Sequence, residues 1–440
     1  MHPMERQPQS INTSDLLEWI HLSSGKLIDT RPIEAFNGWP LQGESRGGHI
    51  KGATTIPIKW AHYIDFQDVL NTKGITPDQP IVIYGYDNRD AEWLAQKLIG
   101  SHYTDVHVYY HFMDEWIPDP DLPMERMERY HQLVYPQWLH SLINEKKPAH
   151  YNGKDYVICH SHYGYEEDYH SGHIPGAIPL NTNDLESTET WNRRTPEELK
   201  EALLNHGIDK NTTVVVYGRF SFPDNKDAYP GQAAGHLGAI RCAAILLYAG
   251  VKDVKILNGG FAAWKEAGMP VSTEPTSPIP KKEFGGTIPG RPGLFVDMPE
   301  AKKLLQSDQG ELVSIRSWEE FIGNVSGYNY IKKTGRIPGA IFGNCGSDAY
   351  HMENYRNLDH TMRDYHEIEA NWAENHITPD KHIAFYCGTG WRGSEAFMNA
   401  YLMGWPQISI FDGGWFEWSN NPDNPIETGV PDKEMKAEHK

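Results

Sequence analysis

The chain has 440 residues, a formal net charge of −19 and 39% hydrophobic residues. This length predicts about three domains, and the negative charge argues against nucleic acid or an anionic membrane as a partner. No stretch is apolar for long enough to cross a membrane, and the polar first residues are not a signal peptide. We expect a soluble protein of the cytoplasm or, if a leader was removed, of the periplasm.

One unit of sequence occurs three times in the same order. Each copy contains an apolar strand, a turn of the form Gly-x-Ile-x-Gly-Ala, a second apolar strand that runs into a loop, and a third strand. The turns lie at 48–53, 172–177 and 335–340, and the second strands are expected at 81–84, 214–217 and 383–386. Short apolar strands that alternate with helices predict a parallel sheet with helices on both faces.

Two proline-containing stretches divide the copies. The first lies at 118–123, and the second, at 270–292, shows neither helical nor strand periodicity. The predicted domains are therefore 1–130, 131–275 and 276–440. The second domain is expected to carry an enlarged polar loop around 221–235.

Cys387 is the strongest candidate for a catalytic residue. It directly follows the apolar run 383–386, and a helix is expected from about Ser394. Backbone N–H groups converge between a strand end and a helix start, which favours a thiolate and holds an anion there. The equivalent positions of the other copies are Gly85 and Gly218, so only the third domain is predicted to be catalytic.

The rest of the loop and one distant arginine are candidate substrate contacts. Arg392 supplies a permanent positive charge, and Trp391 is expected to form a pocket wall. Arg316 follows a predicted strand at the same edge of the sheet, where it serves either in an ion pair or in substrate binding. The predicted substrate-binding residues are Gly388, Thr389, Gly390, Trp391, Arg392 and Arg316.

Neither a metal nor a cofactor is expected. A group of histidines between His160 and His173 lacks the spacing of known metal motifs, and one of them belongs to a repeated turn. Cys345 lies after another such turn, and a structural role is expected for it rather than the role of a resolving thiol.

The repeated turn, the strand that ends in cysteine and a closing Gly-Gly-x-x-x-Trp motif together resemble the rhodanese family of sulfurtransferases. The resemblance implies three tandem rhodanese-like domains, each with a five-stranded parallel sheet, and a persulfide on Cys387. The family's Asp-x-Arg turn is present in the first copy at 29–31, whereas the third copy keeps only Arg316.

The resemblance also implies a reaction, in which Cys387 takes sulfane sulfur from thiosulfate and passes it to cyanide or a thiol. Trp391 and Arg392 favour this small, doubly charged anionic donor. Gly388 argues the other way, because thiosulfate-type loops carry a basic residue there.

Three alternatives stay open. The donor could be 3-mercaptopyruvate, or the chain could be a persulfide relay or binding module that serves a protein thiol or a sulfur-carrier protein. A cysteine phosphatase is disfavoured, because its arginine follows the cysteine by six positions, where this chain has Gly393.

Overall fold

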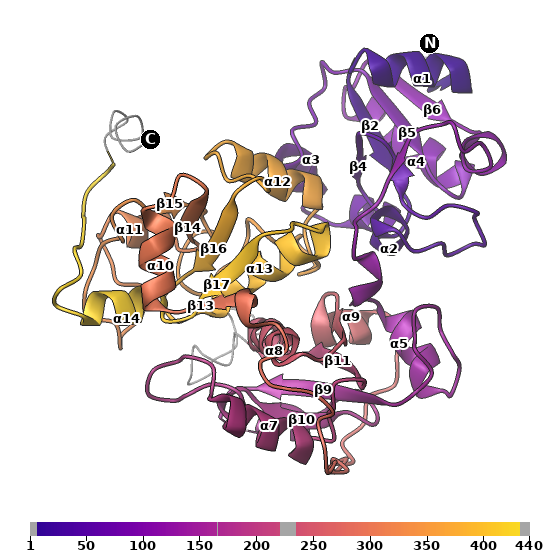
Figure 1. Ribbon diagram of the computed structural model, residues 1–440. Coiled ribbons are helices and arrows are strands. Elements are labelled where there is room, and N and C mark those ends of the chain that lie inside the picture. The colour runs from indigo at the N-terminus through magenta and orange to yellow at the C-terminus, as the bar shows by residue number, and fades with distance from the viewer. Residues whose placement is uncertain (1–6, 165, 221–234, 432–440) are drawn as a thin grey trace. The chain divides into compact units, whose positions relative to one another are not determined.

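The chain forms three five-stranded sheets in which all the paired strands are parallel (Figure 1), so the predicted α/β architecture is confirmed. The computed structural model describes residues 7–164, 166–220 and 235–431. The chain divides into two units, Met1–His131 with the first sheet and Gln132–Lys440 with the other two. The enlarged loop predicted around 221–235 lies, apart from its last residue, outside the described residues.

The first sheet has the strand order β1-β6-β5-β2-β4. Its strands are β1 (Gln9–Ile11), β2 (Lys26–Asp29), β4 (Ala53–Thr55), β5 (Ile81–Tyr84) and β6 (Val106–Tyr109). The helices of this unit are α1 (Thr13–His21), α2 (Ile33–Asn37), α3 (Phe66–Thr72) and α4 (Asn88–Gly100). The same unit also contains a two-stranded antiparallel ribbon, in which β3 (His49–Ile50) pairs with β7 (Met124–Glu125).

The second sheet has the order β10-β9-β11-β12-β8. Its strands are β8 (Leu133–Val134), β9 (Tyr156–His162), β10 (Ile178–Asn181), β11 (Thr213–Tyr217) and β12 (Asp253–Leu257). The helices are α5 (Pro136–Ile143), α6 (Glu167–His170), α7 (Pro196–Asn205), α8 (Gly235–Ala249) and α9 (Gly260–Glu266).

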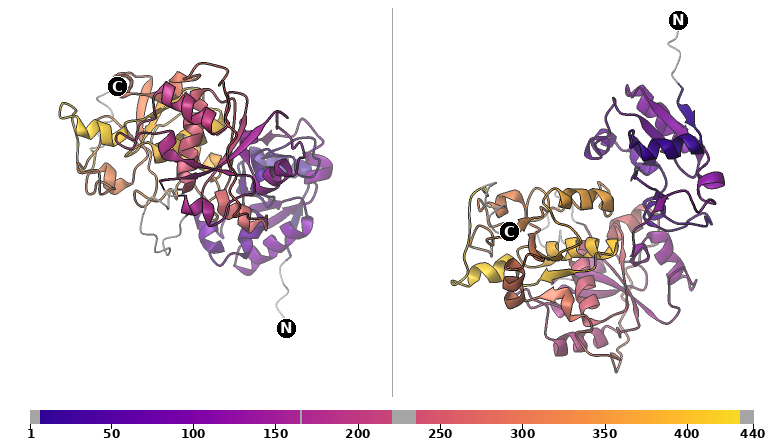
Figure 2. Two further views of the ribbon diagram at one scale, coloured as in Figure 1. Left: turned by 90° about the horizontal axis from the view of Figure 1, so that it is seen from below. Right: turned by 45° about the horizontal axis from the view of Figure 1, so that its top comes forward.

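The third sheet has the order β13-β17-β16-β14-β15, which places β16 in the centre. Its strands are β13 (Phe295–Val296), β14 (Gly310–Ser314), β15 (Ile341–Phe342), β16 (His382–Tyr386) and β17 (Ile408–Phe411). The helices are α10 (Met298–Leu305), α11 (Trp318–Phe321), α12 (Tyr365–Ala373), α13 (Trp391–Met403) and α14 (Gly414–Asn420). Figure 2 shows the same elements from two further directions.

The apolar runs become buried central strands, as expected for a sheet covered on both faces. All residues of β11 are buried, and β16 is buried from its second residue onward. In such a fold ligands bind beyond the carboxyl ends of the strands. Cys387 occupies that place after the central strand of the third sheet.

The expected start of the helix after Cys387 was three residues too late. The helix α13 begins at Trp391, because Gly390 adopts a left-handed backbone conformation with φ of 97° and turns the chain into the helix at once. Arg392 therefore lies in the first turn of α13 and not in the loop before it.

Helix α8 of the second domain packs against α13 of the third domain. At the crossing, a Cβ atom on Gly238 would lie 3.3 Å from the ring of Trp391, so the small residue lets the two helices approach closely. The second domain thus contacts the segment that follows Cys387.

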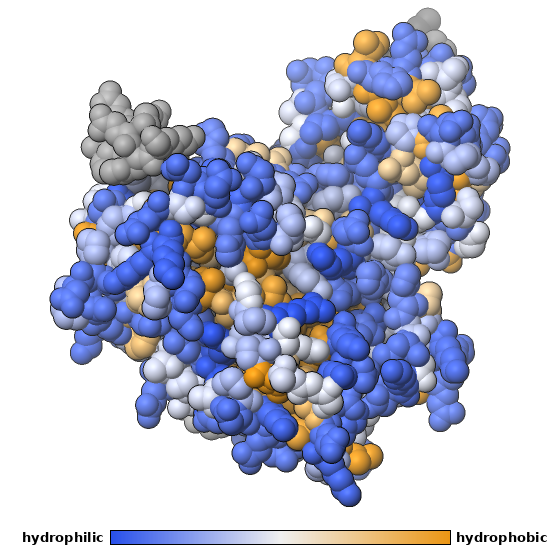
Figure 3. Space-filling view, viewed as in Figure 1, coloured by the Kyte–Doolittle hydropathy of each residue, from blue (hydrophilic) through white to orange (hydrophobic). Residues whose placement is uncertain are grey.

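Hydrophilic side chains cover much of the face in Figure 3, with smaller hydrophobic areas between them. Among the residues that the structure describes, we find no helix with the length and apolar character needed to cross a membrane.

Candidate active site

The sulfur of Cys387 lies at the N-terminal end of α13. The side chain is buried, and its Sγ accepts a hydrogen bond of 3.2 Å from the backbone N–H of Gly390. Gly390 has no side chain that could cap the helix. The sulfur therefore takes the position of a capping acceptor, where the helix dipole stabilises negative charge.

The closing Gly-Gly motif holds the other side of the loop. The carbonyl oxygens of Cys387 and Gly388 accept hydrogen bonds of 2.9 Å from the N–H groups of Trp415 and Phe416 in α14. A Cβ atom on Gly414 would lie 2.6 Å from the Cys387 oxygen, so only glycine permits this approach. Because α14 binds the carbonyl oxygens of the loop, the N–H groups of the loop remain available to an anion.

Gly388 is required by the packing above the loop. A Cβ atom there would lie 2.8 Å from the ring of Tyr328 and 3.2 Å from the side chain of Ile331. A lysine or arginine at this position has no room. The ring of Tyr328 fills the space that the basic side chain of a thiosulfate-type loop would need at this position.

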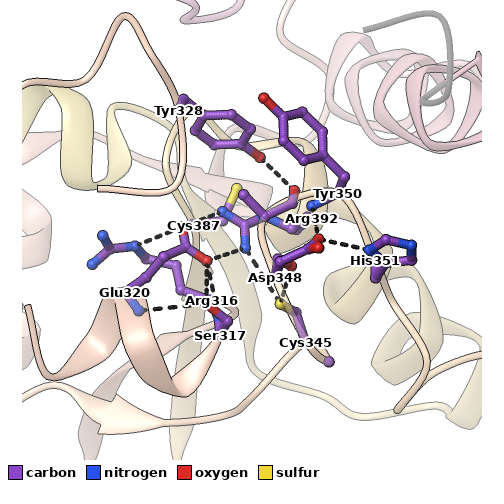
Figure 4. Close-up of polar contacts among 12 residues, drawn as sticks. Arg316, Ser317, Glu320, Tyr328, Cys345, Asp348, Tyr350, His351, Cys387 and Arg392 are labelled. Carbon is purple, nitrogen blue, oxygen red and sulfur yellow. Dashed lines mark hydrogen bonds and ion pairs between the residues drawn. The ribbon is translucent and has the colours of Figure 1, made fainter. Parts of the chain in front are cut away.

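Arg392 is bound in a buried ion pair (Figure 4). Its two terminal nitrogens donate to the two carboxylate oxygens of Glu320 at 2.8 and 2.9 Å, and its guanidinium lies over the ring of Tyr328. One of these nitrogens also lies 3.3 Å from the sulfur of Cys345. The guanidinium that we expected to face a donor anion is thus engaged by protein groups.

Glu320 is the centre of this arrangement. Its carboxylate also accepts hydrogen bonds from the N–H and the hydroxyl of Ser317 at 2.9 and 2.8 Å. Burial acts to raise the pKa of Glu320, but the charge and hydrogen bonds of Arg392, with Arg316 and Ser317, lower it to about 2. The carboxylate is therefore ionised at neutral pH.

Cys345 lies close to Cys387 but in a different environment. Burial raises the pKa of its thiol to about 12, although Arg392 acts in the opposite direction. Its sulfur donates to the Asp348 carbonyl oxygen at 3.3 Å. Cys345 therefore remains a protonated thiol at neutral pH.

Arg316 is fully buried, with one terminal nitrogen bonded to the carbonyl oxygen of Gly335 at 2.7 Å. Its Nε lies 3.5 Å from Glu320, outside good hydrogen-bond geometry, and its second terminal nitrogen has no hydrogen-bond partner among the described residues. Burial lowers the pKa of Arg316, while the charges of Glu320 and Cys387 act to raise it. A buried donor without a partner is costly, and an anion at the site would satisfy it.

Thr389 points to an aromatic side chain. It is buried, and its hydroxyl lies near the phenol of Tyr330. Tyr330 itself is 40% exposed. These contacts lead from the catalytic loop toward solvent.

Trp391 contacts the second domain. Its indole N–H donates to Glu186 at 2.7 Å, and Glu186 accepts a second hydrogen bond of 2.9 Å from Arg241. Arg241 also donates at 2.6 Å to Asp412, the residue before the closing Gly-Gly pair. A buried charge network from the second domain therefore contacts the end of the loop, at Trp391, and the residue before the closing Gly-Gly pair.

The structure brings the predicted residues together at one edge of the third sheet, but their side chains differ in what they reach. The backbone of 388–390 surrounds the sulfur, Arg316 lies within its electrostatic range, and Arg392 and Trp391 are held by acidic residues. Sequence reasoning missed Glu320 and Glu186. The Ser-x-x-Glu pattern at 317–320 is a capping-box signature, so it predicts a helix cap and gives no sign of an ion pair with Arg392.

A buried cysteine sulfur that accepts an N–H bond in a tight loop, together with a parallel sheet that occurs three times, is typical of one class of protein. The family model described as "Rhodanese-like domain" matches residues 12–119, 135–267 and 297–421. The chain belongs to the rhodanese family, with three rhodanese domains, and is a sulfurtransferase of the type that uses a cysteine persulfide.

The chain is similar to particular members of this family. The chain is 40% identical to the thiosulfate sulfurtransferase YnjE of Escherichia coli over 94% of its own length and 91% of that protein. It is also similar to the solved structure of EanB, with a TM-score of 0.95 and 53% identity over 98% of this chain and 100% of that one. Further EanB structures contain hercynine or ergothioneine, and one of them has ergothioneine covalently linked to a persulfide cysteine.

Proposed function

We propose that this chain transfers sulfane sulfur from a Cys387 persulfide to hercynine and releases ergothioneine. The supporting observation is the 53% identity to EanB across nearly the whole chain. Solved EanB structures carry substitutions of a tyrosine and a threonine. Along the sequence, these two residues are separated from the persulfide cysteine of EanB by the same numbers of positions as Tyr328 and Thr389 are from Cys387. Both residues line the loop described above.

The first step loads the sulfur. The Cys387 thiolate attacks the outer sulfur of a sulfane donor, the donor's own sulfur bond breaks, and the leaving group departs with the electron pair. The terminal sulfur of the persulfide then carries the negative charge. The N–H groups at the start of α13 and the unpartnered nitrogen of Arg316 are suited to stabilise it.

The second step forms the carbon–sulfur bond. The terminal sulfur attacks C2 of the imidazolium ring of hercynine, and this carbon becomes tetrahedral. The C2 proton then leaves to a base, the electrons of that bond form the C=S bond, and the sulfur–sulfur bond breaks with its electron pair on Cys387. Ergothioneine differs from hercynine by one sulfur atom, so no external oxidant is needed.

The packing around the loop supports an aromatic acceptor. Tyr328 occupies the space above Gly388, and Tyr330 lies beside Thr389. These rings offer flat apolar surfaces to a planar heterocycle. In this proposal Arg392 does not touch the donor, but holds Glu320 and Tyr328 in place.

Thiosulfate sulfurtransferase activity is the second candidate, and the 40% identity to YnjE favours it. In that case Cys387 passes sulfur from thiosulfate to cyanide or a thiol, and Arg316 binds the sulfonate, because Glu320 already engages Arg392. The absence of room for a cation at Gly388 weighs against this donor.

The experiment that separates the two candidates supplies the protein with thiosulfate or inorganic polysulfide and then with hercynine or cyanide. Intact-protein mass spectrometry should show one added sulfur on the wild type and none on Cys387→Ser. Chromatography should then detect ergothioneine. A persulfide that transfers to cyanide but never to hercynine would overturn the first candidate in favour of the second.

A further inference from the structure

Arg241 reaches from the second domain to the catalytic loop of the third. It lies in helix α8 and is completely buried. Its Nε donates to Glu186 at 2.9 Å, and one terminal nitrogen, Nη2, donates to the Asp412 carboxylate at 2.6 Å and to the Trp191 carbonyl oxygen at 3.0 Å. The other terminal nitrogen, Nη1, has no hydrogen-bond partner among the residues that the structure describes.

The position of this unpartnered nitrogen is fixed. A guanidinium group is planar and rigid, so the hydrogen bonds of Nε and Nη2 along one edge leave Nη1 on the other edge. A Cβ atom on Gly390 would lie 3.1 Å from Nη1 and 3.3 Å from the central carbon of the guanidinium, so the group lies against this glycine. The backbone N–H of Gly390 in turn donates to the Cys387 sulfur. Gly390 therefore contacts both the guanidinium of the second domain and the sulfur of the third.

Arg241 keeps its positive charge at this place. Burial acts to lower its pKa, but the charges and hydrogen bonds of Asp412 and Glu186 raise the pKa above the ordinary value. A buried donor without a partner is costly. A cation is also unfavourable at the N-terminal end of a helix such as α13, where the helix dipole is already positive. An anion at the start of α13 would reduce both costs.

We propose that Arg241 is a positioning residue for the sulfur chemistry, which fixes Gly390 and adds positive potential for the sulfur anion on Cys387. It acts through Gly390 and does not touch the substrate. The second domain, which has Gly218 at the position of the cysteine, thereby supplies part of the catalytic site. The proposal rests on the role proposed above for Cys387 and is the same for either sulfur acceptor.

The variants that test this role must not leave a buried carboxylate unpaired. Removal of Arg241 alone would do so to Glu186, whereas Asp412 keeps its ion pair with Arg193 at 2.9 Å. We therefore compare Glu186→Gln with the double variant Glu186→Gln/Arg241→Gln, and Glu186→Gln/Arg241→Lys restores the charge. The matched control is Glu186→Gln/Arg193→Gln, because Arg193 binds the other oxygen of the same Asp412 carboxylate.

The first test measures the rate of iodoacetamide alkylation of Cys387 against pH, with mass spectrometry to locate the label. Loss of a nearby positive charge disfavours the thiolate, so the midpoint should rise by about one pH unit when Arg241→Gln is added to Glu186→Gln. Arg241→Lys should reverse most of this rise, and the Arg193→Gln control should leave the midpoint unchanged. An unchanged midpoint with Arg241→Gln, or an equal rise with Arg193→Gln, would overturn the proposal.

The second test measures the loading of Cys387 with inorganic polysulfide by stopped flow in the same variants. Loading should be about tenfold slower in Glu186→Gln/Arg241→Gln than in Glu186→Gln, in line with a change of one unit in the thiol pKa. The KM for the acceptor should change little, because Arg241 acts on the sulfur and not on the acceptor. Equal loading rates would overturn the proposal. If the alkylation midpoint rose as expected but the wild type took up no sulfur, the role of Arg241 would stand and the proposed function would be wrong.

Discussion

The first and third domains contain the same turn and the same arginine, and in both a helix follows the central strand, but only the third has a cysteine at the end of that strand. In both domains a buried arginine donates to the carbonyl oxygen of the first glycine of the repeated turn: Arg31 to Gly48 at 2.6 Å and Arg316 to Gly335 at 2.7 Å. The difference lies in what else each arginine binds. Arg31 is paired at 2.7 Å with Asp29, whereas Ser314 stands where the third domain would have this acid.

The two helix starts differ in a similar way. Helix α4 has Asp87 as its N-cap, and the Asp87 carboxylate accepts a hydrogen bond from the N–H of Arg89 at 2.9 Å. Helix α13 has no side-chain cap other than the sulfur of Cys387. The first domain thus neutralises its own anion site with aspartates, and the third leaves the equivalent groups to a sulfur anion. A shared fold does not make a shared site.

The largest effect is expected from exchanging the thiol. Cys387→Ser should abolish sulfur transfer, because a hydroxyl cannot form a persulfide. Adding Gly85→Cys to this variant should not restore it, since a Cβ atom at position 85 would lie 2.2 Å from the Thr30 hydroxyl and the helix start is already capped. Mass spectrometry of the added sulfur and the transfer rate are the measurements. A persulfide on the cysteine introduced at position 85 would break the comparison.

The next effect concerns Glu320, which forms a capping box with Ser317 at the start of α11. The helix that follows Arg31 in the first domain, α2, has no side-chain cap. The pKa of Glu320 is lower in the folded protein, about 2, than its ordinary value of 4.5, so its stabilising effect is present above pH 4.5 and is lost as pH falls toward 2. Glu320→Gln should therefore lower the free energy of unfolding at neutral pH by about 3 kcal/mol, as expected for a broken buried pair.

Urea unfolding from about pH 7 to about pH 3 measures this difference, which should shrink as the pH falls. Glu319→Gln, on the exposed neighbouring residue, is the control and should be nearly neutral. A difference that did not change with pH would mean that the Glu320 charge is not the source of the effect.

A third prediction converts the third domain toward the first. In the first domain the phenol of Tyr84 donates to Asp29 at 2.8 Å, whereas in the third domain the hydroxyls of Ser314 and Tyr386, at the corresponding positions, have no hydrogen-bond partner among the described residues. Ser314→Asp should therefore be accommodated and should pair with Arg316. The rate of persulfide formation from an anionic donor should fall about tenfold, the worth of one charge-assisted bond.

Ser314→Asn, which has nearly the same shape without the charge, is the matched control. Stopped-flow loading of Cys387 with thiosulfate or polysulfide measures both variants. Equal rates in Ser314→Asp and the wild type would show that Arg316 does not contribute to anion binding.

The smallest effect is expected at Glu186, which connects the second domain to the loop. Burial raises the pKa of Glu186 to about 7, more than Arg241 lowers it. Its carboxylate, present above this pH, accepts the hydrogen bonds of Trp391 and Arg241, and protonation at lower pH weakens them. Glu186→Gln should lose about fivefold in transfer rate at high pH, the worth of one hydrogen bond. The ratio of wild-type to variant rates should decline as the pH falls through about 7, and a constant ratio would contradict this role.

Much of the architecture was determined by the sequence itself. The repeated turns and apolar runs predicted three parallel sheets, and β5 has the predicted bounds of 81–84. The position of Cys387 after the central strand followed from local patterns, since a strand, a glycine turn and a helix are each written in neighbouring residues. The rhodanese family membership followed from the same motifs and was confirmed.

What the charged side chains bind was decided only by the tertiary structure. Glu320 stands 72 positions from Arg392, and Glu186 stands 205 positions from Trp391. A loop arginine could face a substrate or a carboxylate, and no local pattern distinguishes the two. The choice depends on which buried carboxylate the fold brings within hydrogen-bond range, because a buried charge without a partner is too costly to leave unpaired.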